Sequence, residues 1–261
     1  MEIGAITGYV DVAQVVLYVF WAFFFVLIYY LHTENKREGY PLESDHLDPA
    51  RRKKINGLTH LPAPKIFRMM DGSIIKAPDP ARADRRPLAA QATANTGGST
   101  IAPTGEPMLA EIGPGSYAER ANTPDMTFEG APKLVPMRVA TDFHVEERDP
   151  DPRGMTVLGA DGQAAGTITD IWVDRGEFVI RFLEMAVAGT EGRRALLPIA
   201  MVVVDGKKRT VSVAALLSNQ FAGIPALANP DQVTRLEEEK IYGYLGAGTL
   251  YATRRRAEPL V

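Results

Sequence analysis

The sequence predicts a single N-terminal transmembrane helix followed by a mainly β cytoplasmic domain, a small antiparallel barrel, with a C-terminal helix. Three observations predict this class: a twenty-residue apolar run near the N-terminus, thirteen of the nineteen prolines between Pro41 and Pro136, and β-rich segments separated by turn residues after residue 135. The chain then divides into a periplasmic start (1–11), a membrane helix (12–31), a Pro-rich segment (32–136), a β domain (137–228) and a C-terminal helix and tail (229–261).

The run from Val12 to Leu31 has Gln14 as its only strongly polar residue and carries no charge. At about 1.5 Å per residue, a helix of this length measures roughly 30 Å, which is the thickness of the hydrocarbon core of a bilayer. A secretory signal peptide is the main alternative. The run is longer than a signal core, no Lys or Arg precedes it and no small-x-small cleavage motif follows it, so a membrane span is the better interpretation.

The charges on either side of this run predict its orientation. Lys36, Arg37 and the basic run at 51–54 follow it, whereas only Glu2, Asp11 and the terminal amine precede it. Lys and Arg are retained on the cytoplasmic side of a membrane. We therefore expect a periplasmic N-terminus and a cytoplasmic location for everything after residue 35.

Composition argues against several classes of function. One span cannot form a pore or a transport path by itself, and a net charge of −3 gives no bulk attraction to nucleic acid. Without cysteine there are no disulfides or thiolate metal sites. No nucleophile elbow, Walker loop or kinase signature is present, so we expect no enzyme and no metal or cofactor bound by this chain alone. The histidines also lack metal-ligand spacing: His32, His46, His60 and His144.

The Pro-rich segment should be extended and irregular, because proline interrupts both helices and sheet ladders. Apolar residues nevertheless recur through it, among them Ile66, Phe67, Met108 and Phe128. We interpret the segment as a coat laid over the surface of partner subunits. A flexible linker is the alternative.

After Val135 the sequence changes to short runs rich in β-branched and aromatic residues, separated by pairs such as Asp161-Gly162 and Asp205-Gly206. This pattern predicts an antiparallel meander or a small barrel. A helix should follow, with Asn229 as N-cap and Pro230 in its first turn, and should end near Gly246.

The pair Arg175-Gly176 predicts a two-residue hairpin loop. In that register Asp174 faces Glu177, Trp172 faces Val179 and Asp170 faces Arg181, all on the outward face. Two like charges so close would titrate as a coupled pair, with one proton held above its ordinary pKa. Two alternatives remain: these acids are ordinary solvated hairpin ends, or a bulged loop shifts the register.

Several motifs are specific when taken together. They are, in chain order, YYLHTENKREGYPLE (29–43), APTGEPM (102–108), KLVPMRVATDFHV (133–145), ITDIWVD (168–174), RFLEM (181–185), FAGIPAL (221–227) and LEEEKIYGYLGAG (236–248). In these motifs the sequence resembles the H subunit of the purple-bacterial photosynthetic reaction centre across nearly its whole length. Residues 139–217 also resemble the PRC-barrel, a small β-barrel module.

The resemblance implies a non-catalytic accessory subunit of a light-driven electron-transfer complex, anchored by one helix in the bacterial inner (intracytoplasmic) membrane. It would cap the L and M subunits, stabilise the complex and help conduct protons to the secondary quinone. Bacteriochlorophyll, bacteriopheophytin, quinones and a non-haem iron would be carried by L and M. Further partners would be membrane lipids and, where the complex includes them, a light-harvesting antenna and a cytochrome subunit.

The resemblance also assigns residues. The family's proton-pathway acids fall on Asp174 and Glu177, with Asp170 and Arg181 beside them, and on Glu238 within LEEEK. One departure is visible. Where the best-known members have two surface histidines, this chain has Phe128, Glu129, Gly130 and Ala131. Glu129 or Asp125 is the candidate for proton uptake at the surface instead.

Two other classes of function are weighed against this one. A membrane-tethered PRC-barrel protein that assists assembly or binding would have a self-sufficient barrel and no need for the TENKREGYPLE motif. A membrane-anchored enzyme would need a nucleophile, metal or phosphate constellation, and the sequence offers none.

Overall fold

A computed structural model describes residues 4–7, 9–44, 49–51, 53–79, 81, 84–95 and 98–257. Glu2, His46, Arg52 and the last four residues, on which some of the expectations above fall, lie outside the described residues. The chain forms two compact units. One comprises residues 1–85 with 94–99, and the other comprises residues 86–93 with 100–261.

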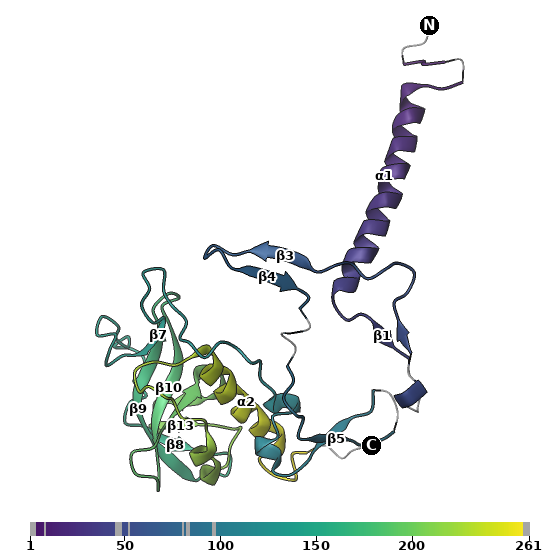
Figure 1. Cartoon of the computed structure of the whole chain (residues 1–261). Coiled ribbons are helices and arrows are strands. Elements are labelled where there is room, and N and C mark those ends of the chain that lie inside the picture. Colours follow the sequence, from purple (N-terminus) through teal and green to yellow (C-terminus); the bar gives the residue numbers. More distant parts are fainter. Residues whose placement is uncertain are drawn as a thin grey trace. The chain divides into compact units, whose positions relative to one another are not determined.

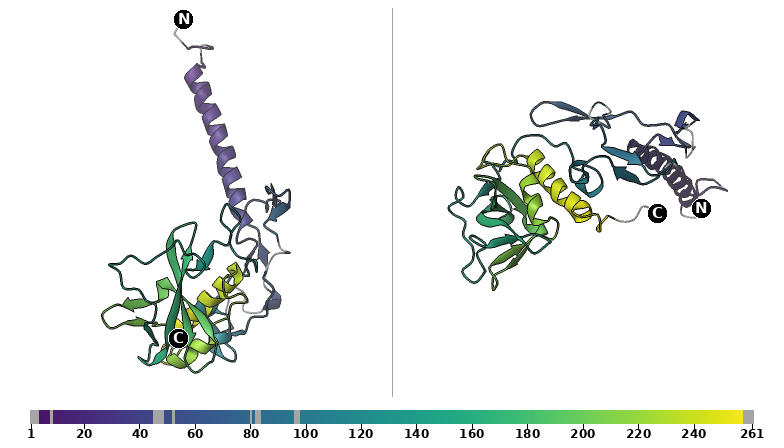
Figure 2. Two further views of the ribbon diagram at one scale, coloured as in Figure 1. Left: turned by 90° about the vertical axis from the view of Figure 1, so that its left-hand side faces the viewer. Right: turned by 90° about the horizontal axis from the view of Figure 1, so that it is seen from below.

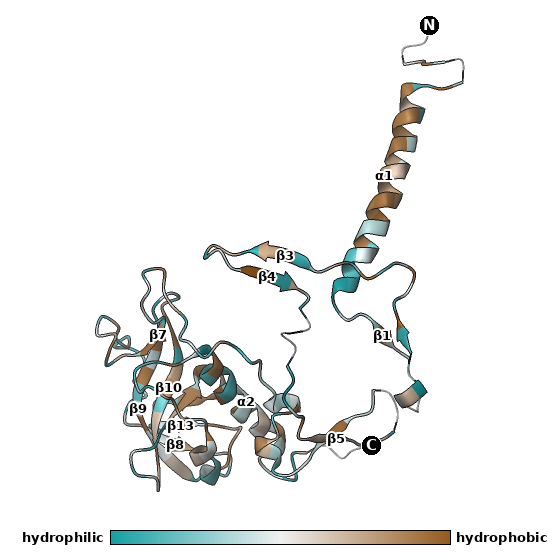
Figure 3. Cartoon of the chain, in the orientation of Figure 1, coloured by the Kyte–Doolittle hydropathy of each residue, from teal (hydrophilic) through white to brown (hydrophobic). Residues whose placement is uncertain are grey.

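The first unit contains the predicted apolar helix, α1 (Val12–Glu34), which is three residues longer than the predicted span. The carboxylate of Asp11 caps it by accepting the backbone N–H of Gln14 at 2.7 Å. Nearly all its apolar side chains are exposed, and Figure 3 shows apolar residues along most of the helix and polar residues at its C-terminal end. Among the described residues, α1 is the one helix long and apolar enough to cross a membrane.

At the C-terminal end of α1, charged side chains hold the following chain against the helix. Glu34 contacts Arg37 at 2.8 Å and Lys65 at 2.6 Å. Lys36 is only 3% exposed and donates to the carbonyl oxygens of Asn56 (2.5 Å) and Thr59 (2.6 Å). Arg37 also donates to the carbonyl of Ala63. We call Glu34, Lys36 and Arg37 the juxtamembrane clamp, and it gives the TENKREG motif a structural role.

The rest of the Pro-rich segment has only short elements, in agreement with its composition. In the first unit they are β1 (Leu42–Glu43) paired with β2 (Lys54–Ile55), β3 (Lys65–Arg68) paired with β4 (Ile74–Ala77), and the 3₁₀ helices η1 (Asn35–Arg37) and η2 (Pro49–Arg51). In the second unit they are β5 (Ala90–Ala92) paired with β6 (Ile101–Pro103), and the 3₁₀ helices η4 (Pro107–Leu109) and η5 (Gly113–Gly115). Figure 1 shows these pieces joined by long irregular connections.

Not all apolar residues of this segment are exposed. Met108 and Ile112 are buried in the second unit, whereas Ile66, Phe67 and Phe128 are exposed. Part of the stretch after residue 100 therefore packs against the β domain of this chain. Ile66, Phe67 and Phe128 remain available for contact with another molecule.

The second unit is built on a seven-stranded sheet with the order β11-β10-β9-β8-β13-β12, in which β7 also pairs with β9. All its pairings are antiparallel except that of β8 with β13, so the antiparallel prediction holds for most of the sheet. The core contains Trp172, Phe182, Phe221 and Leu183, all fully buried. The strands are β7 (Leu134–Pro136), β8 (Thr156–Leu158), β9 (Ala164–Asp174), β10 (Val179–Val187), β11 (Arg194–Pro198), β12 (Val203–Asp205) and β13 (Thr210–Ser212), with 3₁₀ helices η6 (Ile199–Met201) and η7 (Ser218–Gly223).

The C-terminal helix, α2 (Arg235–Tyr251), lies along the sheet (Figure 2). Its N-cap is Thr234, so the prediction of Asn229 was wrong. The Thr234 hydroxyl accepts the N–H of Glu237 at 3.1 Å, and the Glu237 carboxylate accepts the N–H of Thr234 at 2.8 Å. This reciprocal capping box is visible in the sequence as Thr-x-x-Glu, and it outweighs the Asn-Pro signal five residues earlier.

The prediction that the helix ends near Gly246 was also wrong, because the glycines of GYLGAG serve close packing. A Cβ at Gly246 would lie 2.1 Å from the carbonyl oxygen of Pro114, and one at Gly248 would lie 2.5 Å from that of Ala215. Glycine here lets backbone segments approach the helix closely.

We predict that Gly246→Ala lowers stability by about 1–3 kcal/mol through overpacking against Pro114. In an open helix the same change would raise stability by about 1 kcal/mol, so the sign of the effect is diagnostic. Thermal unfolding of the full chain in detergent, followed by near-UV circular dichroism, measures it. Thr249→Ala, at an exposed position of the same helix, is the control and should change the midpoint little.

Candidate functional site

The hairpin of β9 and β10 carries most of the predicted site, but its register differs from the prediction. Asp174 pairs with Val179, Trp172 with Phe182 and Asp170 with Glu184. The expected pairs were wrong for two reasons: the loop has four residues, 175–178, and β10 bulges at Arg181 between Ile180 and Phe182. The expected outward position of Trp172 was also wrong: Trp172 is fully buried, and Asp170 and Asp174 on the same face of β9 are buried with it.

The four-residue loop depends on an unusual conformation at Phe178. This residue has φ +55°, and its N–H donates to the carbonyl of Asp174 at 2.9 Å, which closes the loop. A bulky side chain rarely occupies the left-handed region. The ring of Phe178 stacks on that of Phe143 with centroids 5.6 Å apart, which helps to hold the loop in place.

Asp174 and Glu177 share a cation instead of facing each other directly. The ammonium of Lys133 lies 3.4 Å from the Asp174 carboxylate and 3.0 Å from that of Glu177. The hydrogen bond to Glu177, followed by the charge of Asp174, raises the pKa of Lys133. Asp174 is buried and accepts the N–H groups of Gly176 and Glu177, both at 2.9 Å, whereas the Glu177 side chain is exposed. The cluster therefore has two acids held around one lysine.

Asp170 belongs to a separate network centred on Arg138. The guanidinium of Arg138 lies 3.0 Å from the carboxylates of Asp170, Glu184 and Asp231. Glu184 is 2% exposed and also accepts the indole N–H of Trp172 at 2.9 Å. Such complete pairing is what a buried carboxylate requires. Sequence reasoning missed Glu184, although a single acid inside the apolar run of β10 was a usable signal.

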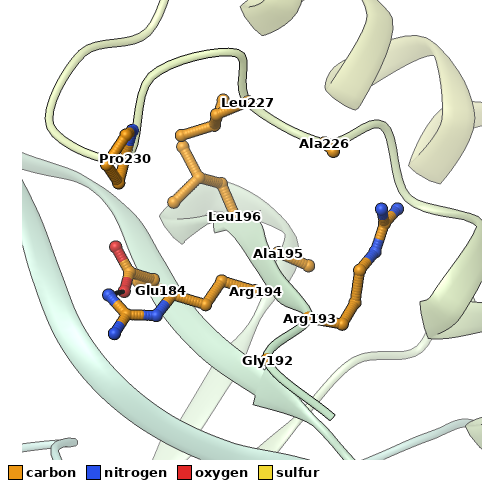
Figure 4. Close-up of a pocket in the computed structure, with 9 residues that line it drawn as sticks. All are labelled: Glu184, Gly192, Arg193, Arg194, Ala195, Leu196, Ala226, Leu227 and Pro230. Carbon is orange, nitrogen blue, oxygen red and sulfur yellow. Dashed lines mark hydrogen bonds and ion pairs between the residues drawn. The ribbon is translucent and has the colours of Figure 1, made fainter. Parts of the chain in front are cut away.

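The outer side of this network borders a pocket of about 330 Å³ with apolar walls, including Leu196, Leu227 and Pro230. Figure 4 shows Arg194 extending across its floor to Glu184, where the two groups lie 2.9 Å apart. Arg193 lines the opposite wall and donates to backbone carbonyl oxygens. The charges at this pocket are thus largely satisfied within the protein.

Glu238 has a different environment from the other glutamates of LEEEK. Glu237 closes the capping box, and Glu239 pairs with Arg120 at 2.6 Å. Glu238 is half-buried and, in the part of the chain that the structure describes, its carboxylate has no hydrogen bond or ion pair. Burial raises its pKa above the ordinary value; Arg181 opposes the shift, and the negative charges of Asp125 and Asp174 add to it.

Arg181 and Glu238 line a common pocket of about 180 Å³, together with Arg120, Arg235 and Tyr242. Desolvation raises the pKa of the Tyr242 phenol, while Arg181 lowers it and Glu238 adds to the rise. The pocket thus combines a half-buried acid and a phenol, both with raised pKa values, with the side chains of three arginines.

Asp125 and Glu129 line a second, larger pocket of about 740 Å³. Lys133, which holds Asp174 and Glu177, borders the same pocket. The negative charge of Asp125 also contributes to the raised pKa of Glu238, although Asp125 does not line the pocket of Glu238. The backbone carbonyl of Asp125 accepts the N–H of Lys133 at 2.8 Å. The pKa of Glu129 is lowered, chiefly by its own backbone N–H and by the Thr127 hydroxyl.

The structure thus brings Asp125, Asp174, Glu177 and Glu238 into one neighbourhood, with Arg181 beside Glu238. We call these four acids the acid track. Asp170 lies outside it, in the Arg138 network. Within the described ranges, no group of three or more His, Asp or Glu side chains is placed to hold a metal ion.

Comparison with known families gives two matches. Residues 4–139, more than half of the chain, match the sequence model described as the photosynthetic reaction centre, H-chain N-terminal region. Residues 144–217 match the PRC-barrel domain. The second match covers strands β8 to β13 and the hairpin that carries Asp174 and Glu177.

We predict that the free energy of unfolding of the Glu238→Gln variant, measured relative to that of the unsubstituted chain, increases as pH rises. Below the ordinary pKa of 4.5, Glu238 is protonated in both folded and unfolded states and imposes no penalty. Above it, the unfolded state ionises first, because folding raises the pKa. The folded state therefore loses stability until the raised pKa is passed, by about 1.4 kcal/mol for each pKa unit of the shift.

Urea unfolding of the full chain between pH 4 and 8 tests this expectation. Glu239→Gln is the matched control, since it removes the ion pair with Arg120 and should not gain stability with rising pH. A constant difference between Glu238→Gln and the unsubstituted chain at all pH values would refute the role of burial at Glu238.

Proposed function

The chain belongs to the family of photosynthetic reaction centre H chains, and on that premise we propose that it caps the L and M subunits on the cytoplasmic side and helps conduct protons to the secondary quinone. Membership in the family implies association with L and M, and it implies that pigments and quinones are carried by subunits other than this one. The helix α1 is consistent with a single-pass anchor. Periplasmic placement of the N-terminus follows from the flanking charges and is part of the proposal.

Capping is supported by the apolar residues that the chain leaves uncovered. Phe128, Met126 and Phe178 are exposed around the pocket that contains Asp125, Glu129 and Lys133. Exposed aromatic and methionine side chains beside a polar pocket are characteristic of a protein interface. We propose that L and M cover this surface and thereby enclose the acid track.

Proton conduction is supported above all by the position of Glu238. It is the half-buried acid of the track that has no partner among the described residues, and burial raises its pKa above the ordinary value. An acid with a raised pKa binds and releases protons at higher pH than an ordinary carboxyl group does. Arg181, which opposes the shift, would tune that pKa.

The other acids of the acid track would transfer protons from the surface to Glu238. We propose that Asp125 takes up protons at the surface, since the pKa of Glu129 is lowered below its ordinary value, which disfavours protonation of Glu129. Asp174 and Glu177, joined by Lys133, would form the next step. The Arg138 network, including Asp170, would fix the hairpin in position, because its acids are fully paired.

The driving force comes from the quinone. Reduction places negative charge in a site of low dielectric constant, which raises the proton affinity of carboxylates nearby. A series of acids with different pKa values can respond to that charge over a range of pH. The function of this chain would then be to connect the quinone site with water.

We predict that the chain, tagged and extracted from photosynthetic membranes in mild detergent, copurifies with pigmented L and M subunits. The absorption spectrum and subunit composition of the eluate measure this. In inside-out vesicles, added protease should leave most of residues 41–261 intact when L and M are present and digest them when they are absent. A colourless chain that migrates alone would refute the capping function and leave a membrane-tethered PRC-barrel protein as the better interpretation.

We predict that Glu177→Gln slows the proton-coupled second electron transfer to the secondary quinone by on the order of tenfold or more, because an amide cannot carry a proton. Primary charge separation should be unchanged. Flash-induced absorbance changes in the assembled complex measure both rates. Glu191→Gln, in the exposed loop between β10 and β11, is the control for loss of one surface charge. An unaltered second transfer from pH 6 to 9 would exclude Glu177 from the route.

A further inference from the structure

The β3–β4 hairpin is fastened to the inner end of the membrane helix. Lys65, the first residue of β3, lies 2.6 Å from the carboxylate of Glu34, the last residue of α1. Arg37 holds the chain two residues earlier, through the carbonyl of Ala63. Figure 1 shows the hairpin extending sideways from this end of α1. The hairpin therefore begins at the level of the lipid headgroups, if α1 spans the membrane as proposed.

This attachment limits how far the hairpin's charges can move from the membrane. Arg68 is three residues after Lys65, and a strand rises about 3.3 Å per residue, so Arg68 stays within about 10 Å of the pinned position in any orientation of the hairpin. That distance is close to the Debye length of about 8 Å at physiological ionic strength. Arg68 therefore stays within about one Debye length of the attachment point, where part of the negative potential of a membrane surface still acts on it.

The register of the hairpin gives its two faces different characters. Ile66 pairs with Lys76, and Arg68 pairs with Ile74, so these four residues share one face, which we call the basic face. Phe67 pairs with Ile75 on the opposite face. Lys65 also lies on that face, where it forms an ion pair with Glu34. Ile66, Ile74 and the tip residue Met70 are exposed. The basic face thus alternates cations with uncovered apolar side chains.

The two cations of the basic face have no acid of their own. Arg68 and Lys76 contact no carboxylate in the described part of the chain. The acid of the hairpin, Asp71, lies in the turn, where its carboxylate accepts the N–H of Ser73 at 2.9 Å. The positive charge of this face is therefore available to an external anion.

We propose that the basic face of the β3–β4 hairpin binds anionic phospholipid at the inner surface of the membrane. The isoleucines would enter the boundary between headgroups and acyl chains, while Arg68 and Lys76 bind lipid phosphates. Exposed apolar side chains alternating with unpaired cations, on a hairpin attached to the end of the membrane helix, match the layered chemistry of an anionic lipid surface. The opposite face, with Phe67 and Ile75, remains for the protein partner. The inference rests on the membrane anchor of the proposed function and does not depend on proton conduction.

The experiment uses the assembled complex in lipid nanodiscs, with and without phosphatidylglycerol. This chain has no cysteine, so Met70→Cys gives it one thiol for an environment-sensitive fluorophore at the exposed hairpin tip, and the complex without Met70→Cys, labelled in parallel, gives the background from partner subunits. Quenching by spin-labelled lipid reports contact with the membrane, and quenching by iodide reports contact with water. Pigment absorbance of the same discs shows that the complex has assembled, which separates failure of this inference from failure of the proposed function.

We predict strong quenching by spin-labelled lipid at position 70, increased by phosphatidylglycerol. Arg68→Gln combined with Lys76→Gln should weaken association of the hairpin with anionic lipid by about fivefold for each cation removed. Lys207→Gln combined with Lys208→Gln removes the same charge from an exposed loop of the second unit and should leave the quenching unchanged. A fluorophore at Val203→Cys, in that unit, should not respond to loss of Arg68 and Lys76.

Three results would overturn the proposal. Quenching by iodide without quenching by lipid would show that the tip lies in water. Protection from both quenchers in the assembled complex would show that protein covers it. Quenching by lipid that does not change with phosphatidylglycerol, or with the loss of Arg68 and Lys76, would rule out recognition of anionic lipid by these cations.

Discussion

The first unit of this protein cannot bury its own apolar side chains, and this constraint governs the rest of the structure. In the second unit the sheet and α2 enclose a core with Trp172 and Phe182 at its centre. In the first unit α1 and the hairpin leave theirs exposed. Burial of apolar side chains away from water is the main stabilising contribution to folding. A unit without a core therefore needs a partner surface or an apolar environment to cover those side chains. As proposed above, a bilayer provides this cover for α1 and for the basic face of the hairpin, and partner subunits provide it for the remainder.

Without a core, polar contacts determine the local structure of the first unit. Lys36 is an instructive case, because a buried ammonium normally needs a carboxylate. Here two carbonyl oxygens accept its hydrogen bonds, and the ring of Tyr40 lies 5.5 Å from the ammonium. The negative end of the α1 dipole is close by and favours a cation at this position. The clamp therefore uses backbone oxygens and a helix end to neutralise charge that would otherwise be costly to bury.

The sequence was sufficient for features that depend on local pattern, and insufficient for those that depend on tertiary contacts. The apolar run of α1 and the β-rich runs of the barrel needed only composition and periodicity. The end of α2 could not be predicted from GYLGAG, because the reason for Gly246 is the carbonyl of Pro114, more than a hundred residues away. The hairpin register depended on the conformation of Phe178, which ordinary turn preferences disfavour. The N-cap of α2 did not depend on tertiary contacts. The Thr-x-x-Glu pattern at Thr234 indicates a capping box in the sequence alone.

The acids of the candidate site differ in how far their negative charge is compensated by partners within the protein. Asp170 and Glu184 are buried with complete sets of partners, so their charge is compensated whatever happens outside the domain. Asp174 and Glu177 share Lys133, and Glu177 remains exposed to water. At a given separation, two charges interact about four times more strongly at an effective dielectric constant of 20 than in bulk water. A partner that covers Glu177 and Asp125 would therefore strengthen their coupling to Glu238 without moving any atom of this chain. Capping and proton conduction are, on this argument, one function: the acid track becomes a route only when another subunit excludes the solvent from it.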